Sequence, residues 1–118
     1  MKPIEPALIP VPGGKTIEEY FGRVNTGDTA VSIARMVAPP GWEEPAQQPA
    51  FDEYTVVLDG TLLVETQAGT VTVTAGHGIH TPAGQRIRYA TTQGATYVAV
   101  CLPAFAEELA ARDDEPST

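Results

Sequence analysis

Short runs rich in Val, Thr, Ile and Tyr alternate with turn signals from residue 28 onward, and this rhythm constrains the fold more than any other feature. Such runs are expected to be strands, at 29–37, 52–58, 61–66, 70–74, 78–81, 87–92 and 96–102. Glycines between the runs supply positive φ, and Asp59-Gly60 predicts a two-residue hairpin turn. Many short strands at this spacing are typical of an all-β sandwich or barrel.

The length of the chain sets the domain organisation. A chain of 118 residues with 42% hydrophobic content is the size of one domain with one core. Residues 28–103 are expected to form a barrel, and residues 1–27 an N-terminal arm in which "KTIEEYFGR" is either a helical turn or a first edge strand. Residues 104–118 are expected to form a short helix after Pro103 and a frayed tail at "RDDEPST".

The charge of the chain narrows its partners. A net charge of -8, with seven Lys and Arg in total, offers no basic patch for nucleic acid or an anionic membrane surface. The chain has no apolar run of transmembrane length, and prolines interrupt the apolar residues of "MKPIEPALIPVPGG". We therefore expect a cytoplasmic protein. The single cysteine, Cys101 in "YVAVCLP", is expected to be a small buried hydrophobic residue.

The run 52–58 places a carboxylate among Thr and Val. Because side chains alternate along a strand, Glu53 shares a face with Thr55 and Val57, and Tyr54 lies on the other face. A carboxylate on the inner face of a barrel would be a functional group. Alternation alone leaves open which of the two faces is the inner one.

Two glycine-containing motifs have the spacing of known signature motifs, carried by Gly41, Glu53, Gly60, Gly76, Pro82 and Gly84. On these residues the chain resembles the cupin family from about residue 30 to about residue 102. The resemblance implies an all-β fold, a cupin-type double-stranded β-helix (jelly-roll barrel), here with a short C-terminal helix. It also implies that Glu53 points into the barrel, opposite Ile87, Tyr89 and Thr91, and that Arg86 and Arg88 face outward. Arg88 is then expected to pair with an acidic side chain at a sheet surface or dimer interface, and an anion clamp in the pocket is the alternative.

The histidines that bind metal in cupins are absent from these motifs. Their positions are occupied by Gln47, Pro49 and Ile87. A transition metal needs three or four converging ligands, and the motif positions offer Glu53 and, weakly, the amide oxygen of Gln47. We therefore expect no metal ligand and no cofactor.

The chain has two histidines, both before the Pro-X-Gly turn. His77 lies at a turn and is expected to face solvent. His80 lies in the run 78–81, where an inward orientation would let it meet Glu53 as an acid/base partner or as a metal ligand. An outward, structural His80 is the alternative.

The expected site is an apolar pocket with few polar groups. The candidate catalytic residues are Glu53, Tyr89 and His80, and the candidate substrate-binding residues are Gln47, Gln48, Trp42, Phe51, Met36, Ile87 and Tyr97. Burial would raise the pKa of Glu53 towards neutral pH, where a carboxyl exchanges protons readily. A Tyr hydroxyl or Gln amide could then hydrogen-bond the oxyanion of an enolate-like intermediate.

Three hypotheses for function follow. The first is a metal-independent acid/base enzyme of the isomerase, dehydratase, lyase or cyclase type, acting on a small organic molecule through Glu53; the cupin resemblance permits it, because some cupins work without metal and some are polyketide cyclases. The second is a non-catalytic cupin that binds a small ligand or is purely structural. The third is a metal site rebuilt from His80 and Glu53.

We also expect a homodimer. A short barrel leaves an open sheet edge that a second copy can cover. The proline-rich arm at residues 1–14 could lie across a partner's edge.

Overall fold

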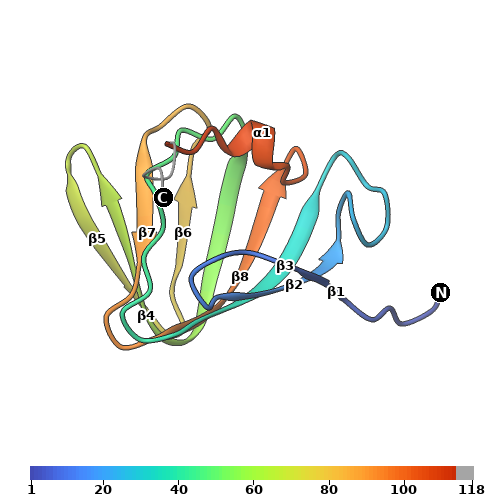
Figure 1. Ribbon diagram of the computed structural model, residues 1–118, viewed down its shortest axis with the longest axis horizontal. Helices are drawn as coiled ribbons and strands as arrows, with labels where there is room; N and C mark the ends of the chain where they lie inside the picture. Colours follow the sequence, from blue (N-terminus) through green and yellow to red (C-terminus); the bar gives the residue numbers. More distant parts are fainter. Residues whose placement is uncertain (114–118) are drawn as a thin grey trace.

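The computed structural model describes residues 1–113, which form eight strands and one short helix (Figure 1). The elements are β1 (Ala7–Ile9), β2 (Thr16–Phe21), β3 (Ser32–Ala38), β4 (Asp52–Thr66), β5 (Gly69–Thr74), β6 (Gly78–Thr81), β7 (Ile87–Ala90), β8 (Ala95–Leu102) and α1 (Glu107–Ala110). Each run expected to be a strand overlaps an observed strand, and two of the runs belong to the same strand, β4. The all-β jelly-roll prediction is confirmed.

Strand β4 belongs to two antiparallel sheets. Its first half, up to Gly60, pairs with β8 on one side and with β6 on the other, in a sheet that continues through β3 and β2 to β1. Its second half, from Thr61, pairs with β5 and β7. The predicted strands 52–58 and 61–66 are therefore one strand, and β4 joins the two walls of the barrel.

Asp59-Gly60 is not a hairpin turn, so this prediction was wrong. The pairing of β4 with β8 shifts register between Val57 and Asp59, and Gly60 has φ +75°. The chain bends there and continues into the second sheet. A Cβ on Gly60 would lie 2.1 Å from the carbonyl oxygen of Gly94. A glycine with positive φ serves a bend as well as a turn, so local sequence could not distinguish them.

Alternation along β4 sets the inner face of the barrel. Glu53, Thr55 and Val57 are buried, and Tyr54 is exposed, which confirms that Glu53 points inward. The main core contains Ala38, Trp42, Val57, Leu62, Val64, Val73, Ile87, Tyr89, Ala95 and Tyr97.

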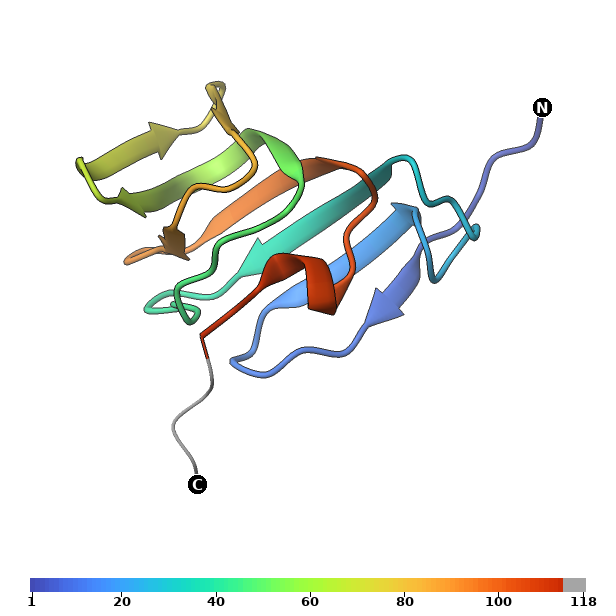
Figure 2. The same ribbon diagram turned by 90° about the horizontal axis from the view of Figure 1, so that it is seen from above.

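A second, smaller core lies under the helix. Helix α1 lies above the strands in Figure 2, and it adds Ala110 and Leu109 to a cluster with Phe51, Phe105 and Cys101. Cys101 is buried, as predicted, and this burial raises the pKa of its thiol above the usual range.

The segments 7–21 and 104–113 both contact the rest of the barrel. "KTIEEYFGR" contains strand β2, so the strand alternative is correct, but β2 lies between β1 and β3 and β1 is the edge strand. The predicted C-terminal helix is α1. Arg112 and Asp113 were predicted to be frayed, which is wrong, because they form ion pairs with Glu44 and Arg86; the rest of the predicted tail, 114–118, lies outside the described residues. Within residues 1–113 no helix is long and apolar enough to cross a membrane.

Replacing Gly60 by Ala is expected to destabilise the protein more than the same change at Gly76. Both glycines have positive φ, +75° and +85°, so each Ala strains the backbone by about 1–2 kcal/mol. A new Cβ meets nothing within 4 Å at Gly76 but meets backbone atoms at Gly60, which adds roughly 1–3 kcal/mol of overpacking. Urea denaturation measures both free energies of unfolding. Equal losses in the two variants would contradict the role given to the contact with Gly94.

Candidate functional site

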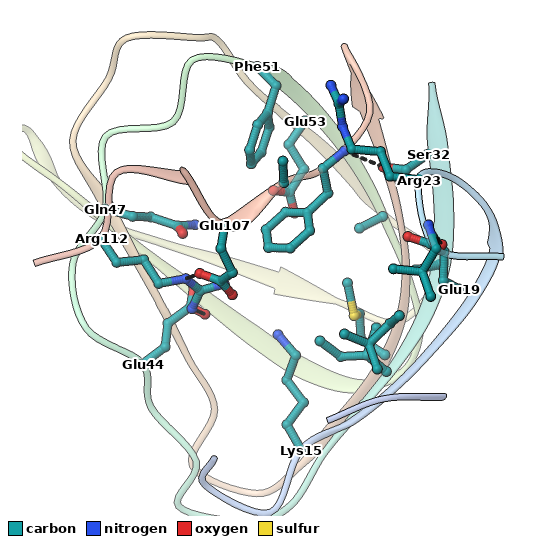
Figure 3. Close-up of a pocket in the computed structure, with 18 of the residues that line it drawn as sticks. Lys15, Glu19, Arg23, Ser32, Glu44, Gln47, Phe51, Glu53, Glu107 and Arg112 are labelled. Carbon is teal, nitrogen blue, oxygen red and sulfur yellow. Dashed lines mark hydrogen bonds and ion pairs between the residues drawn. The ribbon is translucent and has the colours of Figure 1, made fainter. Parts of the chain in front are cut away.

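A cavity of about 320 Å³ lies on the inner face of β2, β3, β4 and β8 (Figure 3). Its apolar wall includes Ile17, Ala34, Met36, Phe51, Ala99 and Phe105. Its polar lining includes Lys15, Glu44, Gln47, Glu53, Tyr89, Tyr97, Glu107 and Arg112. A second, more open hollow of about 790 Å³ shares Lys15, Ile17, Glu44, Glu107 and Arg112 with it. The shared residues therefore separate the cavity from a wider opening.

Glu53 is the central carboxylate of the cavity. It lies on β4 between Cys101 of β8 and Thr81 of β6, and only 7% of its surface is exposed. The Thr55 hydroxyl donates a hydrogen bond of 3.3 Å to its Oε2. Burial, followed by the negative charge of Glu44, raises the pKa of Glu53 to about 7. A carboxyl with this pKa can both take and give a proton near neutral pH.

Two buried tyrosines present hydroxyl groups to the same cavity. The hydroxyl of Tyr89, on β7, lies 2.9 Å from the hydroxyl of Thr81. The hydroxyl of Tyr97, on β8, accepts a hydrogen bond of 3.1 Å from Lys15 Nζ. Burial raises the pKa of both phenols well above its usual value. Both therefore stay neutral and can donate hydrogen bonds.

Lys15 brings a primary amine into the cavity from the segment between β1 and β2. In Figure 3 its side chain points towards the centre of the cavity. Its Nζ lies 4.4 Å from the centre of the Trp42 ring. Burial lowers the pKa of Lys15, and the charges of Glu44 and Glu53 oppose this effect.

Our sequence reasoning missed Lys15, although a signal was present. The chain has only two lysines, and Lys15 precedes a strand in which Ile17 and Glu19 are buried. Lys15 has the same parity as these two residues, so the period of a strand already predicts that it points inward.

An ion-paired cluster of Glu44, Arg112 and Glu107 closes one side of the cavity. Arg112 Nη1 lies 3.0 Å from Glu44 Oε2, and its Nε lies 3.2 Å from Glu107 Oε2. Glu44 is buried, and its other oxygen has no hydrogen-bond partner in the described chain, nor has Oε1 of Gln47. We missed this cluster because nothing local in "WEEP" or "RDDEPST" indicates that these distant segments meet.

The structure brings most of the predicted site residues together. The predicted site residues that line the cavity are Glu53, Tyr89, Gln47, Phe51, Met36 and Tyr97. The predicted residues that do not line it are His80, Gln48, Trp42 and Ile87.

The inward orientation considered for His80 is wrong. Thr81 pairs with Glu53 and is buried, so the preceding residue of β6, His80, must face the other way. The His80 ring stacks on exposed Tyr54 at a centroid distance of 4.3 Å, and its Nε2 lies 3.3 Å from Asp52 Oδ1. His80 and Glu53 therefore lie on opposite faces of the sheet and cannot share a site. His77 is exposed at its turn, as predicted.

The other three predicted site residues that do not line the cavity are Gln48, Trp42 and Ile87. Gln48 is exposed and donates a hydrogen bond to the carbonyl oxygen of Gly84. Trp42 and Ile87 belong to the main core, and Trp42 borders the open hollow. Gln48 and Trp42 lie in the segment 39–51, which is not a regular strand, so alternation could not place their side chains.

The outward-facing arginines were predicted correctly. Arg88 forms ion pairs with Glu43 and Glu65, and Arg86 forms one with Asp113.

The donor set does not fit the metal that the cupin fold implies. Two of the positions that carry histidine in cupins are Pro49 and Ile87, which have no side-chain donor, and the third is the amide of Gln47. No three His, Cys, Asp or Glu side chains within residues 1–113 converge to hold a metal ion. The cavity instead contains the cationic groups of Lys15 and Arg112 beside its carboxylates.

A family model and a curated protein match the chain. The model described as "Ethanolamine utilisation protein EutQ" matches residues 47–108. A Myxococcus xanthus (strain DK1622) protein named Endoribonuclease YbeY is 47% identical over 105 residues, which make up 87% of this chain and 36% of that protein. The chain therefore spans about a third of the length of this relative.

Solved structures match the fold. An RmlC-like cupin from Shewanella frigidimarina has a TM-score of 0.73 at 15% identity and covers 87% of each chain. The polyketide cyclase RemF from Streptomyces resistomycificus has a TM-score of 0.71 at 18% identity, over 92% of this chain and 89% of that chain. At these identities the likeness shows the fold alone.

Replacing Glu53 by Gln is expected to stabilise the protein at neutral pH and to change little at low pH. The folded-state pKa of Glu53 is about 7 against a usual value of 4.5, so the folded state binds more protons than the unfolded state between these values. Its free energy of unfolding should therefore fall as pH rises through this window, by on the order of 3 kcal/mol. The Glu53→Gln variant has no carboxyl at this position, so its free energy of unfolding should not fall in this way as pH rises.

Urea denaturation at a series of pH values measures the effect. Glu5→Gln, at an exposed carboxylate, is the control and should keep the wild-type pH profile. Parallel profiles for wild type and Glu53→Gln would show that Glu53 titrates in its usual range.

Proposed function

This chain belongs to the EutQ family and has the cupin fold, and we propose that it binds a small organic carbonyl compound in its barrel and moves a proton on it with Glu53. The observation that carries this proposal is the burial of Glu53 beside Glu44, which raises the pKa of Glu53 to about 7. Perturbed carboxyls of this kind, inside a cavity, are typical of general acids and bases.

The charges of the cavity support a ligand without several negative charges. Glu44, Glu53 and Glu107 all line it, and a polyanion would meet their repulsion. The guanidinium of Arg112 is already paired with Glu44 and Glu107. A volume of about 320 Å³ suits a small molecule, and the wall that includes Met36 would hold its apolar part.

The proposed reaction begins with proton abstraction. The Glu53 carboxylate takes a proton from the carbon next to the carbonyl group, and the electron pair moves onto the carbonyl oxygen. The neutral hydroxyl of Tyr89 or Tyr97 donates a hydrogen bond to this oxyanion, which stabilises it more than the starting carbonyl. Protonated Glu53 then returns the proton to another carbon in an isomerisation, or to a leaving group in an elimination.

Two relatives bear differently on this proposal. RemF, which has the same fold, is a polyketide cyclase, and its name is compatible with an organic substrate in a barrel of this kind. The endoribonuclease activity named for the M. xanthus protein suits this chain poorly, because the chain spans 36% of that protein and has a net charge of -8.

Non-catalytic binding is the second candidate, and one observation favours it. Buried oxygens of Glu44 and Gln47 have no hydrogen-bond partner in the described chain. A ligand with a hydroxyl or amino group would satisfy both, and binding alone could be the reason for their arrangement.

Glu53→Gln should separate the two candidates. The variant keeps the shape of the side chain but cannot accept the proton, so deuterium exchange from solvent into the α position of cyclohexanone should slow by about 10²- to 10⁴-fold. Proton NMR measures the exchange, and a thermal shift measures ligand binding. His80→Ala, on the outer face, should keep the wild-type rate. Exchange that is equally fast in Glu53→Gln would refute the proton-transfer role.

We further propose that the outer face of β4 pairs with a second copy of the chain. Tyr54, Val56 and Leu58 on this face are 44%, 49% and 53% exposed, and an apolar sheet face of this kind is usually covered. Val56→Asp should convert a dimer into a monomer in analytical ultracentrifugation at micromolar concentration. Val71→Asp, at a residue of β5 that is 43% exposed, should leave the dimer intact. A monomeric wild-type protein would contradict this proposal.

A further inference from the structure

The Lys15 amine is enclosed by the cavity but is not ion-paired. Its Nζ donates a hydrogen bond of 3.1 Å to the Tyr97 hydroxyl, and within residues 1–113 no carboxylate lies at ion-pairing distance from it. Arg112, by contrast, pairs with Glu44 and Glu107. A buried amine without an ion-paired carboxylate loses its proton more readily than a surface lysine, because burial disfavours the charged form.

We propose that the Lys15 amine forms an imine with the carbonyl carbon of a small aldehyde or ketone in this cavity. This inference rests on the proposed function, because the carbonyl compound is the same substrate. Lys15 lines both the cavity and the open hollow beside it. A ligand that enters from the hollow therefore meets the amine before it reaches the apolar wall at Met36 and Phe51.

The neighbours of Lys15 supply the proton transfers that imine formation needs. The neutral amine attacks the carbonyl carbon, a C–N bond forms, and the carbonyl oxygen takes the proton of the Tyr97 hydroxyl. The nitrogen returns a proton to the Tyr97 phenolate, which leaves a neutral carbinolamine. The Tyr97 hydroxyl then gives a proton to the carbinolamine hydroxyl and takes one from the nitrogen, the C–O bond breaks, water leaves and the C=N bond forms, so the step consumes one amine and one carbonyl group and releases one water.

All the charged groups around Lys15 are compatible with this chemistry. Glu44, Glu53 and Glu107 favour its protonated form, whereas Arg112 and burial favour the neutral form, with burial the largest effect. The cavity therefore allows a neutral amine for attack. It also provides carboxylates that stabilise the cationic iminium once this has formed.

An iminium at Lys15 would also account for Glu53. A protonated imine withdraws electrons from the neighbouring carbon more strongly than a carbonyl does, so a carboxylate with a pKa of about 7 can remove the α proton. The product is an enamine. In this arrangement the protonated imine withdraws electrons from the substrate. A metal ion can perform the same role, but the cavity lacks the ligands to hold one.

Reductive trapping tests the inference directly. The protein is treated with propanal and sodium cyanoborohydride, which reduces an imine to a stable propylamine, and peptide mass spectrometry follows each labelled amine. The chain has only one other lysine, the exposed Lys2, which serves as a control within the same molecule. At neutral pH we expect Lys15 to be labelled several-fold faster than Lys2. Slower labelling of Lys15, or none, would overturn the proposal.

Three variants make the test specific. Lys15→Arg keeps the positive charge beside Trp42 and should lose the label in the Lys15 peptide while its thermal unfolding stays near wild type. Tyr97→Phe keeps the ring but removes the hydroxyl, and it should slow labelling of Lys15 by about 10²-fold without changing Lys2. Labelling of Lys15 at the wild-type rate in Tyr97→Phe would refute the role of that hydroxyl in the step.

Glu53→Gln distinguishes this inference from the proposed function. The variant should still be labelled at Lys15, because Glu53 acts only after the imine has formed. Deuterium exchange that is as fast in Glu53→Gln as in the wild type, with fast labelling of Lys15 intact, would refute the proton-transfer function alone. Exchange without labelling would refute the imine alone.

Discussion

The bend of β4 at Gly60 is the constraint on which the rest of the structure depends. Because this strand leaves one sheet and enters the other without a turn, the two walls of the barrel share a covalent connection and a continuous backbone. The bend requires positive φ and a close approach to the carbonyl of Gly94, which only glycine permits. It also holds the first half of β4 between β6 and β8, where the inward face carries Glu53.

A carboxylate enclosed in this way is costly, and the cavity is arranged to reduce the cost. Glu53 receives one hydrogen bond from Thr55, and the cationic Lys15 and Arg112 favour its ionised form. Burial and the charge of Glu44 still outweigh them, so Glu53 titrates near neutral pH. In metal-binding cupins the converging histidines would place a divalent cation here. In this chain Lys15 and Arg112 supply the positive charges that line the cavity.

Closure of the cavity depends on segments that are far apart in the chain. Arg112, after helix α1, reaches Glu44 in the segment that precedes β4, and Lys15 enters from the edge of the sheet. Lys15, Glu44, Glu107 and Arg112 line both the cavity and the open hollow. Glu19, Arg23 and Ser32 lie on the opposite side of the cavity (Figure 3).

Sequence alone determined the fold class and the strands, because turn chemistry and the period of a strand are local properties. The inward direction of Glu53 came from the resemblance to cupins, since alternation left the inner face open. Sequence also indicated Tyr89, Tyr97, Gln47, Phe51 and Met36 as lining residues, through their strands or through the cupin motifs. Only the tertiary structure decided that His80 faces outward, that β4 runs through Asp59-Gly60, and that Lys15, whose parity is a local signal, meets Tyr97 and Arg112 in one cavity. These facts depend on which strands pair, in which register, and on which distant segments meet. Such contacts join residues that are up to 82 positions apart, as for Lys15 and Tyr97, and no local pattern encodes them.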